Sequence, residues 1–425
     1  MGQKSSKVSY NSSSYVDKSK ITDFIVDTSE ESFDLSDFTN LECIDYRLNK
    51  IPIITGVTNV KHVILNKMAR NMNNIIKAKQ YTIPANLFQN GIFTHAQSLE
   101  IKGDGNPLIL DNFDGDKYPN LITLEIESVA VDSELLCDIS KLKLLRRLIF
   151  KSCSGIKSCD WNIIEEHCPH LISLGFKSME IDSQMLHKIS SLKRLRSLEF
   201  DSCTRLRSCD WTKLDLPELQ VLLTDIDRQS KLSNIKFLEK YRNLVVLRLN
   251  ISSKCKNIDV LSKLTPRYLH LKKIIPGIIL PTSVEMLNLR KVKGSEQSIK
   301  YMENLKMLCV HYIFDGKTSE HLEISDDVLQ THNRMDDKLC SVNKALWNKG
   351  FDDIIETIRA QQGNIKVIEP VEVTVADQVD LVVAPTVATV DPIATTVDPT
   401  AAYKELLEKV AVLTKYIESQ KMLGK

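Results

Sequence analysis

The sequence has no long hydrophobic run, and no apolar stretch approaches the roughly 20 residues that a membrane-spanning helix needs. A secretory signal is also missing, because the first thirty residues are polar and rich in serine and lysine. Neither sign of charge is in excess, since 56 lysines and arginines face 55 aspartates and glutamates, for a net charge of +1. We therefore expect a cytoplasmic chain without the basic footprint of a nucleic-acid binder.

Motifs of catalysis and cofactor binding are missing too. There is no glycine-rich phosphate loop, no catalytic-triad signature and no ligand cluster at metal-binding spacing. Cys340, in KLCSVNK, could be read as a nucleophile, but no paired His/Asp motif accompanies it. The ten cysteines are scattered along the chain, which without a secretion signal favours reduced thiols. We therefore expect no enzymatic activity, no cofactor and no metal ion.

The sequence does contain an internal repeat. Residues 118–161 align with 168–211 at a constant offset of fifty, so that FKSCSGIKSCDW at 150–161 returns as FDSCTRLRSCDW at 200–211. A finer L-x-x-L-x-L pattern recurs about thirteen times between Leu41 and Val310. Its clearest copies are Leu121/Leu124/Ile126, Leu145/Leu148/Phe150, Leu171/Leu174/Phe176 and Leu195/Leu198/Phe200.

This pattern resembles the leucine-rich repeat family, whose period is about 20–29 residues. The proline-bearing repeats around IPANLF (83–88) are loosely similar to the short repeats of large DNA viruses and amoebae. The resemblance implies an α/β solenoid, an arc with a parallel concave sheet, in which each turn buries the apolar side of its neighbour. The apolar spacing in 132–144 predicts helices on the convex side of the middle repeats, whereas the shorter repeats leave room only for an extended or 3₁₀ return.

The paired cysteines fit this repeat. Cys153 and Cys203 occupy the position after the motif where, in the family, a side chain bonds to backbone of the neighbouring turn. Trp161 and Trp211 are expected to fill equivalent gaps between turns. The C-x5-C spacing does not match the usual zinc ligand pairs, so packing is the favoured role, with a metal site and a redox pair as the alternatives.

We divide the chain into five regions. They are a flexible arm (1–35), the repeat solenoid (36–315), a helical cap (316–365), a Val/Thr/Pro-rich acidic linker (366–400) and a short amphipathic or coiled-coil helix (401–425). The opening MGQKSS matches the N-myristoylation pattern with Gly2 as the acceptor. One acyl chain binds membranes only marginally and reversibly, so the attachment would be conditional.

The last region carries an apolar seam at helical 3,4 spacing: Tyr403, Leu406, Val410, Leu413 and Ile417. It spans barely three heptads, which is marginal for an isolated helix. Association with a second copy or with a partner helix is one interpretation. Docking back onto the solenoid is the other.

The concave face is the expected binding surface of a solenoid. Toward the C-terminal repeats its charges turn basic, and we predict a stripe for an acidic protein surface or a phosphate-bearing ligand: Arg248, Arg267, His270, Lys272, Arg290, Lys306 and His311. The alternative is an ordinary solvated face. Nucleic acid is not expected, because only Tyr268 could serve as a stacking platform there.

The leading functional interpretation is a non-enzymatic protein–protein interaction scaffold with lipid-assisted membrane attachment. A structural component of a virus particle, lying between membrane and shell, is a second interpretation. A substrate receptor of a ubiquitin ligase is a third, although the N-terminal segment lacks the Leu-Pro opening of an F-box. The chain would accordingly be cytoplasmic, peripheral to a membrane or virion-associated.

Overall fold

A computed structural model describes much of the chain up to residue 332. The described residues are 7–9, 21–27, 31–47, 50–57, 60–65, 72, 75–88, 92–104, 108–110, 113–224, 231–273, 277–291, 302–305, 307–310 and 329–332. All of them fall within one compact unit, Ser5–Gln362.

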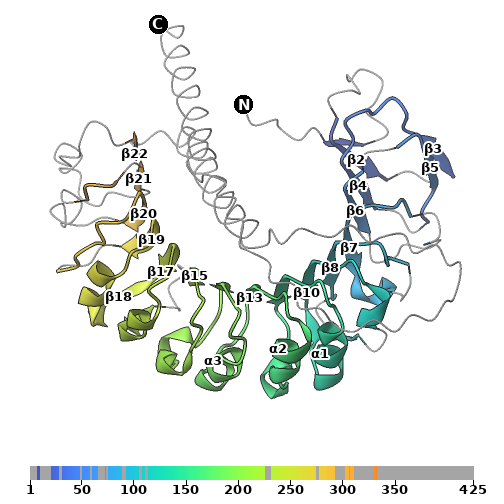
Figure 1. Ribbon diagram of the computed structural model, residues 1–425. Coiled ribbons are helices and arrows are strands. Elements are labelled where there is room, and N and C mark those ends of the chain that lie inside the picture. Colours follow the sequence, from blue (N-terminus) through green and yellow to red (C-terminus); the bar gives the residue numbers. More distant parts are fainter. Residues whose placement is uncertain are drawn as a thin grey trace, which may run out of the picture. The chain divides into compact units, whose positions relative to one another are not determined.

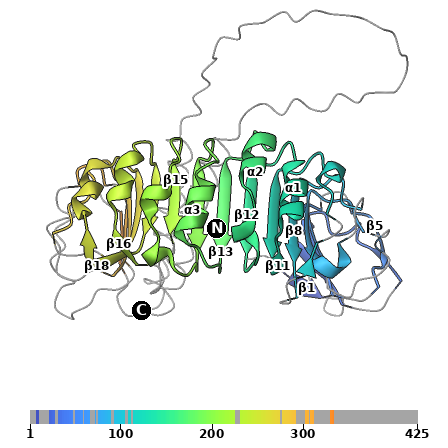
Figure 2. The same ribbon diagram turned by 90° about the horizontal axis from the view of Figure 1, so that it is seen from below.

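Within the part of the chain that the structure describes, one sheet of sixteen parallel strands forms the inner side of an arc (Figures 1 and 2). Its strands, in spatial order, are β1 (Lys7–Ser9), β2 (Asp23–Val26), β4 (Cys43–Tyr46), β6 (His62–Leu65), β7 (Gln80–Pro84), β8 (Ser98–Lys102), β10 (Thr123–Glu127), β12 (Arg147–Lys151), β13 (Ser173–Lys177), β14 (Ser197–Asp201), β15 (Val221–Thr224), β17 (Val246–Leu249), β19 (Tyr268–Lys273), β20 (Met286–Lys291), β21 (Met307–Val310) and β22 (Leu329–His332). Each strand pairs with the next turn of the chain, as the stacking of repeats predicts.

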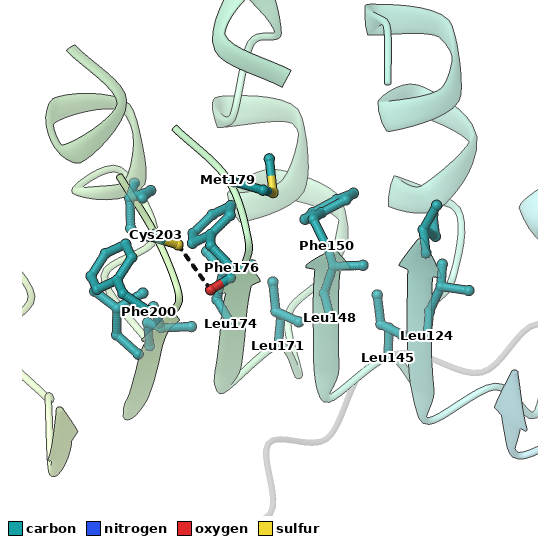
Figure 3. Packing of buried hydrophobic residues seen from close by; sticks show 14 of the residues in the cluster. Leu124, Leu145, Leu148, Phe150, Leu171, Leu174, Phe176, Met179, Phe200 and Cys203 are labelled. Atoms are coloured by element: carbon teal, nitrogen blue, oxygen red, sulfur yellow. Dashed lines mark hydrogen bonds between the residues drawn. The ribbon is translucent and has the colours of Figure 1, made fainter. Parts of the chain in front are cut away.

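The register places equivalent leucines side by side. Leu148 pairs with Leu174, and Leu174 pairs with Leu198. The column continues through Leu222 to Leu247. These side chains are fully buried beneath the sheet, and Figure 3 shows two such columns running across successive strands. The predicted in-phase stacking of the L-x-x-L-x-L motif is therefore confirmed.

The outer side of the arc carries short helices (Figure 1). The α-helices are α1 (Ser133–Ser140), α2 (Asn162–His167) and α3 (Ser183–Ile189), and the 3₁₀ helices are η4 (Ala85–Leu87), η5 (Gly115–Lys117), η6 (Ile156–Ser158), η7 (Leu206–Ser208), η8 (Trp211–Lys213), η10 (Lys236–Lys240) and η11 (Ile258–Lys263). Asp132 caps α1 by accepting a 2.8 Å hydrogen bond from the amide of Leu135, and Asp182 caps α3 in the same way. Helices in the middle repeats and a 3₁₀ return in the shorter repeat at 83–88 are as predicted.

Among the described residues, three two-stranded parallel sheets accompany the main one. They pair β3 (Ser32–Asp34) with β5 (Ile53–Thr55), β9 (Leu108–Ile109) with β11 (Val129–Ala130), and β16 (Leu232–Asn234) with β18 (Ile251–Lys256). Each turn of the solenoid that contributes to them has a second short strand in addition to its strand in the main sheet. The repeats thus differ in their return path while sharing the same inner strand.

The tryptophans of the repeated segment pack between turns, as expected. Trp161 is buried and meets Phe150 and Phe176 edge-on, with ring centroids 6.0 Å away in each case. Trp211 meets Phe200 edge-on and stacks on Phe237 at 4.8 Å. Such contacts add to the burial of the rings themselves.

The repeated cysteines bond to backbone of the preceding turn. The Cys153 thiol donates to the carbonyl oxygen of Ile126 at 3.3 Å, and the Cys203 thiol donates to that of Phe176 at 3.2 Å (Figure 3). Cys159 and Cys209 repeat the pattern one step later, toward Val131 and Ile181. The predicted ladder of side chain to backbone bonds along the stack is confirmed.

Two boundaries differ from the sequence-based division. Strand β2 already pairs with β4 and buries Phe24 and Val26, so the solenoid begins before residue 36. Its DFIV strand alternates inward and outward without a leucine motif, so the leucine pattern does not predict it. Within the region predicted to be a helical cap, residues 329–332 form β22 on the edge of β21. An open parallel edge offers backbone partners that a local helical pattern does not reveal.

Candidate interaction surface on the concave face

Side chains alternate along each strand, so residues between the buried leucines stand on the concave face. The parallel register arranges them in two rows. The first row, at the strand starts, contains Asp23, Cys43, His62, Gln80, Ser98, Thr123, Arg147, Ser173, Ser197, Val221, Val246, Tyr268 and Met286. The second row contains Ile25, Asp45, Ile64, Thr82, Glu100, Glu125, Ile149, Gly175, Glu199, Leu223, Arg248, His270 and Asn288.

The N-terminal part of this face, from β2 to β10, is mostly polar and partly exposed to solvent. A hydrogen-bonded chain crosses three of its strands. His62 Nε2 lies 2.9 Å from Thr82 Oγ1, which donates to Glu100 Oε2 at 2.8 Å. Burial lowers the pKa of His62 from its usual 6.5, against the opposing effect of Glu100. These two hydrogen bonds hold the side chains of His62, Thr82 and Glu100 in one orientation.

Carboxylates give this open part its charge. Asp45 pairs with Arg47 at 3.1 Å, and Glu100 pairs with Lys102 at 3.0 Å. Glu125 follows Glu100 in the same row, one strand further on. Partly exposed ion pairs of this kind contribute about 0–1 kcal/mol, so a partner's charges could replace them at little cost.

The C-terminal part, from β12 to β20, differs in both character and exposure. The first row becomes apolar at Val221, Val246, Tyr268 and Met286, each at most 5% exposed. Ile149 and Leu223 in the second row are also buried. None of these six belongs to the hydrophobic core cluster, which lies on the other face of the sheet. Their burial therefore has a separate origin from that of the leucine columns.

The predicted basic stripe falls within this C-terminal part. Arg248 and His270 are register neighbours in the second row. Arg248 reaches Glu199 at 3.6 Å across the intervening strand, and their side chains are 18% and 14% exposed. Because β15 runs between them, the ion pair spans the register position of Leu223. The positive charge of Arg248 is thus balanced by the carboxylate of Glu199.

The other stripe residues are placed unequally. Arg267 makes two hydrogen bonds to Glu285, at 2.6 and 3.2 Å, and its guanidinium lies 5.8 Å from the Tyr268 ring centre. His270 is buried, and Lys272 is partly exposed. The backbone of Arg290 lies in β20. Lys306 and His311 lie outside the described residues, so the stripe as a binding surface stays a prediction.

Two further predictions also lie outside the described residues. One is the acylation of Gly2. The other is the helical seam of Tyr403, Leu406, Val410, Leu413 and Ile417.

Sequence reasoning missed the apolar rows of the C-terminal part. The signal was present in LQVLLT (219–224), where apolar residues fill the facing positions as well as the inward ones, and in NLVVLRL (243–249). The pattern does not separate the two faces there, because valine and leucine at the facing positions are as apolar as the leucines that form the core. The hydrogen bonds that join His62, Thr82 and Glu100 could not be predicted from the sequence, because they depend on the register of three strands.

The thiols of the repeat show no sign of activation. Burial raises the pKa of Cys153 to about 11 and that of Cys168 and Cys209 to about 12. The eight cysteines whose side chains are described are free thiols. Among the described residues, no three His, Cys, Asp or Glu side chains are placed to hold a metal ion. Nor does any helix there have the length and apolar character needed to cross a membrane.

No protein-family model and no curated protein sequence matches the chain. Among solved structures it is similar to an internalin from Listeria monocytogenes, with 16% identity, a TM-score of 0.37, and coverage of 75% of this chain and 88% of that one. A leucine-rich repeat protein from Leptospira interrogans gives 15% identity, a TM-score of 0.32, and coverage of 66% and 74%. A plant peptide hormone receptor, solved in complex with RGF2, gives 14%, 0.26, and 69% and 56%.

The assignment of the fold comes from the chain's own repeat. The L-x-x-L-x-L motif, its in-register parallel sheet and the helices on the outer side coincide turn by turn. The chain therefore has the fold of a leucine-rich repeat solenoid.

Proposed function

We propose that the protein is a non-enzymatic scaffold that binds a protein partner on the open, N-terminal part of its concave face. The observation that carries this proposal is the partly exposed, mostly polar surface from β4 to β10, held in register by consecutive strands. Regular strands position side chains more rigidly than loops do, which reduces the entropy lost on binding.

The chemistry of this surface favours a partner with basic groups or hydrogen-bond donors. Asp45, Glu100 and Glu125 lie in the second row, and the cation partners of Asp45 and Glu100 are exposed enough to be displaced. Complementary charge of this kind accelerates encounter and fixes orientation more than it adds affinity. A partner with acidic groups would instead use the basic stripe around Arg248 and Lys272.

Two matched triple variants distinguish these surfaces. One is Asp45→Lys, Glu100→Lys and Glu125→Lys, and the other is Arg248→Glu, Lys272→Glu and Arg290→Glu. Each is compared with the unchanged protein by affinity purification and mass spectrometry, after circular dichroism has established that both variants fold. We expect the first triple variant to lose specific partners and the second to keep them.

The outcomes separate the possibilities. Loss of the same partners only in the second variant would transfer the binding site to the basic stripe. Retention of every partner in both variants would contradict binding through the concave face.

We further propose that acylation of Gly2 supplies a conditional membrane attachment, on the basis of the MGQKSS motif. The intact mass of protein produced in eukaryotic cells tests this directly, with Gly2→Ala as the control. The wild-type protein should carry the myristoyl increment and the variant should not. A wild-type mass without the increment would remove the proposal. No described residue favours the particle-component or ligase-receptor interpretations over the scaffold.

A further inference from the structure

His62 stands in the first row of the concave face, on β6, between Cys43 on β4 and Gln80 on β7. Its side chain is partly exposed. Histidine changes its charge near neutral pH, where carboxylates and lysines keep theirs. What His62 can offer to a binding partner therefore depends on the state of its two ring nitrogens, and that state follows from the residues that they contact.

The hydroxyl group of Thr82 decides the role of one ring nitrogen. Thr82 is only 4% exposed, so its hydroxyl group depends on protein partners for its hydrogen bonds. It donates its one proton to Glu100 Oε2 at 2.8 Å, while the other carboxylate oxygen of Glu100 pairs with Lys102 at 3.0 Å. Thr82 Oγ1 can therefore only accept at its 2.9 Å contact with His62 Nε2, and Nε2 is the ring nitrogen that carries the proton.

The second ring nitrogen of His62, Nδ1, is left as an acceptor. A neutral imidazole carries a proton on only one nitrogen, so a protonated Nε2 leaves a lone pair on Nδ1. Among the described residues no group donates a hydrogen bond to Nδ1, and the atom is not buried. Nδ1 thus offers a hydrogen-bond acceptor to solvent or to a partner. It becomes an N–H donor on a positively charged ring when the imidazole takes up a second proton.

We propose that His62 is a recognition residue of the N-terminal part of the concave face, where Nδ1 of the neutral ring accepts a hydrogen bond from a lysine ammonium group of the partner. Protonation of the ring removes this acceptor and places a positive charge next to that of the partner, so binding weakens as the pH falls. This inference rests on the proposed function, because it concerns the regulation of the same surface.

The charged groups around His62 act in both directions. Burial has the largest effect and lowers the pKa of His62 below its usual 6.5. Glu100 on β8, Asp23 on β2 and Asp45 on β4 favour the charged ring, and Lys102 on β8 opposes it. Strand β7 places only uncharged side chains in the two facing rows. The ring is therefore neutral at about pH 7.5, and acidification toward about pH 5.5 brings it into its titration range.

A lysine-bearing partner couples its own binding to this protonation. A bound ammonium group opposes the charged ring, so binding should lower the pKa of His62 further, and protonation should lower the affinity by the same factor. Lysine itself, with a pKa of about 10.4, stays charged throughout this range, and ordinary carboxylates titrate below it. A change of affinity between about pH 7.5 and 5.5 therefore reports on histidine.

NMR of the full-length protein labelled with ¹⁵N-histidine tests the bonding of the ring. At about pH 7.5 the Nε2–H proton of His62 should give a visible signal, because the hydrogen bond to Thr82 slows its exchange with water. His62→Gln identifies the signal, and Thr82→Val should remove it. A ring proton on Nδ1 in its place, or a signal that Thr82→Val leaves unchanged, would overturn the proposal.

A short synthetic peptide of alternating lysine and serine is the probe for binding, and the fluorescence anisotropy of the labelled peptide measures its affinity. The unchanged protein should bind it roughly threefold more weakly at about pH 5.5 than at about pH 7.5. His62→Gln keeps a side chain that can donate to Thr82 but does not titrate, so its affinity should be the same at both pH values. The matched control His187→Gln, at an exposed position on α3, should retain the threefold difference.

The outcomes separate this inference from the proposed function. Equal affinity of the unchanged protein at both pH values, or a pH dependence that persists in His62→Gln, would overturn the role of His62 and leave the binding surface in place. The variant that combines Asp45→Lys, Glu100→Lys and Glu125→Lys should lose the peptide at both pH values. Undiminished binding by that variant, or no binding by the unchanged protein, would contradict the proposed surface and this inference together.

Discussion

The two parts of the concave face are built from the same strand, yet they present different surfaces. Between β2 and β10 the facing positions hold carboxylates, histidine and hydroxyl groups, most of which are partly exposed. Between β12 and β20 they hold valine, leucine, tyrosine and methionine that are buried, with Arg248 and Glu199 paired among them. The repeat therefore fixes the backbone, and the residues between the leucines decide whether a turn is open or covered.

The sharpest way to test this difference is to place the same charge in each part. Val246→Asp puts a carboxylate into a buried apolar position and should lower the free energy of unfolding by about 2–4 kcal/mol. Thr123→Asp, in the same row of the open part, should change it by no more than about 0.5 kcal/mol. Urea unfolding followed by circular dichroism measures both. Equal destabilisation by the two variants would mean that the two parts are equally covered.

A second comparison uses the ion pairs. Arg248→Met removes the partner of a carboxylate that is only 14% exposed, and should cost about 1–3 kcal/mol. Lys102→Met removes the more exposed partner of Glu100 and should cost at most about 0.5 kcal/mol.

The double variant Arg248→Met with Glu199→Gln should recover part of the loss, because neither charge of the pair is then left without the other on the covered face. A loss of similar size for Lys102→Met, or no recovery in the double variant, would contradict the assigned difference in burial.

The smallest expected effect is a pH dependence confined to the open part. Burial lowers the pKa of His62 below its ordinary 6.5, so the unfolded chain binds a proton at higher pH than the folded chain. Stability should therefore be complete above about pH 7 and decline as the pH falls through 6.5, levelling off below the folded pKa. His62→Gln should remove this component, as seen in melting temperatures between about pH 7.5 and 5. A steeper decline in the variant would mean that His62 is stabilised in its charged form.

Much of the fold could be predicted because its signal is redundant. About thirteen copies of one motif specify the inward columns, and the ladder cysteines and inter-turn tryptophans follow from their place in the repeat. The strand DFIV was not predicted, because four alternating residues without leucine do not stand out from a polar background. Strand β22 was not predicted, because its pairing depends on an open sheet edge and not on a local sequence pattern.

The candidate surface was harder to predict than the fold. Sequence alone can place Arg248 and His270 on the concave face, but it cannot show that Arg248 reaches Glu199 two strands away or that His270 is buried. Those facts depend on register, side-chain reach and what lies over the face. A count of basic residues on the concave face therefore overstates the positive charge of its accessible surface. The partly exposed carboxylates of the N-terminal part are the stronger candidates for contact with a partner.

One accessibility scan tests the central contrast most directly. Single cysteines replace Ser98, Thr123, Ser173, Val221, Val246 and Met286 along the first row, and each is modified by the same reagent in the full-length protein. We predict rapid modification at residues 98 and 123 and slow modification at the other four, with the step falling near β12. A uniform rate along the row would contradict the division of the concave face into an open and a covered part.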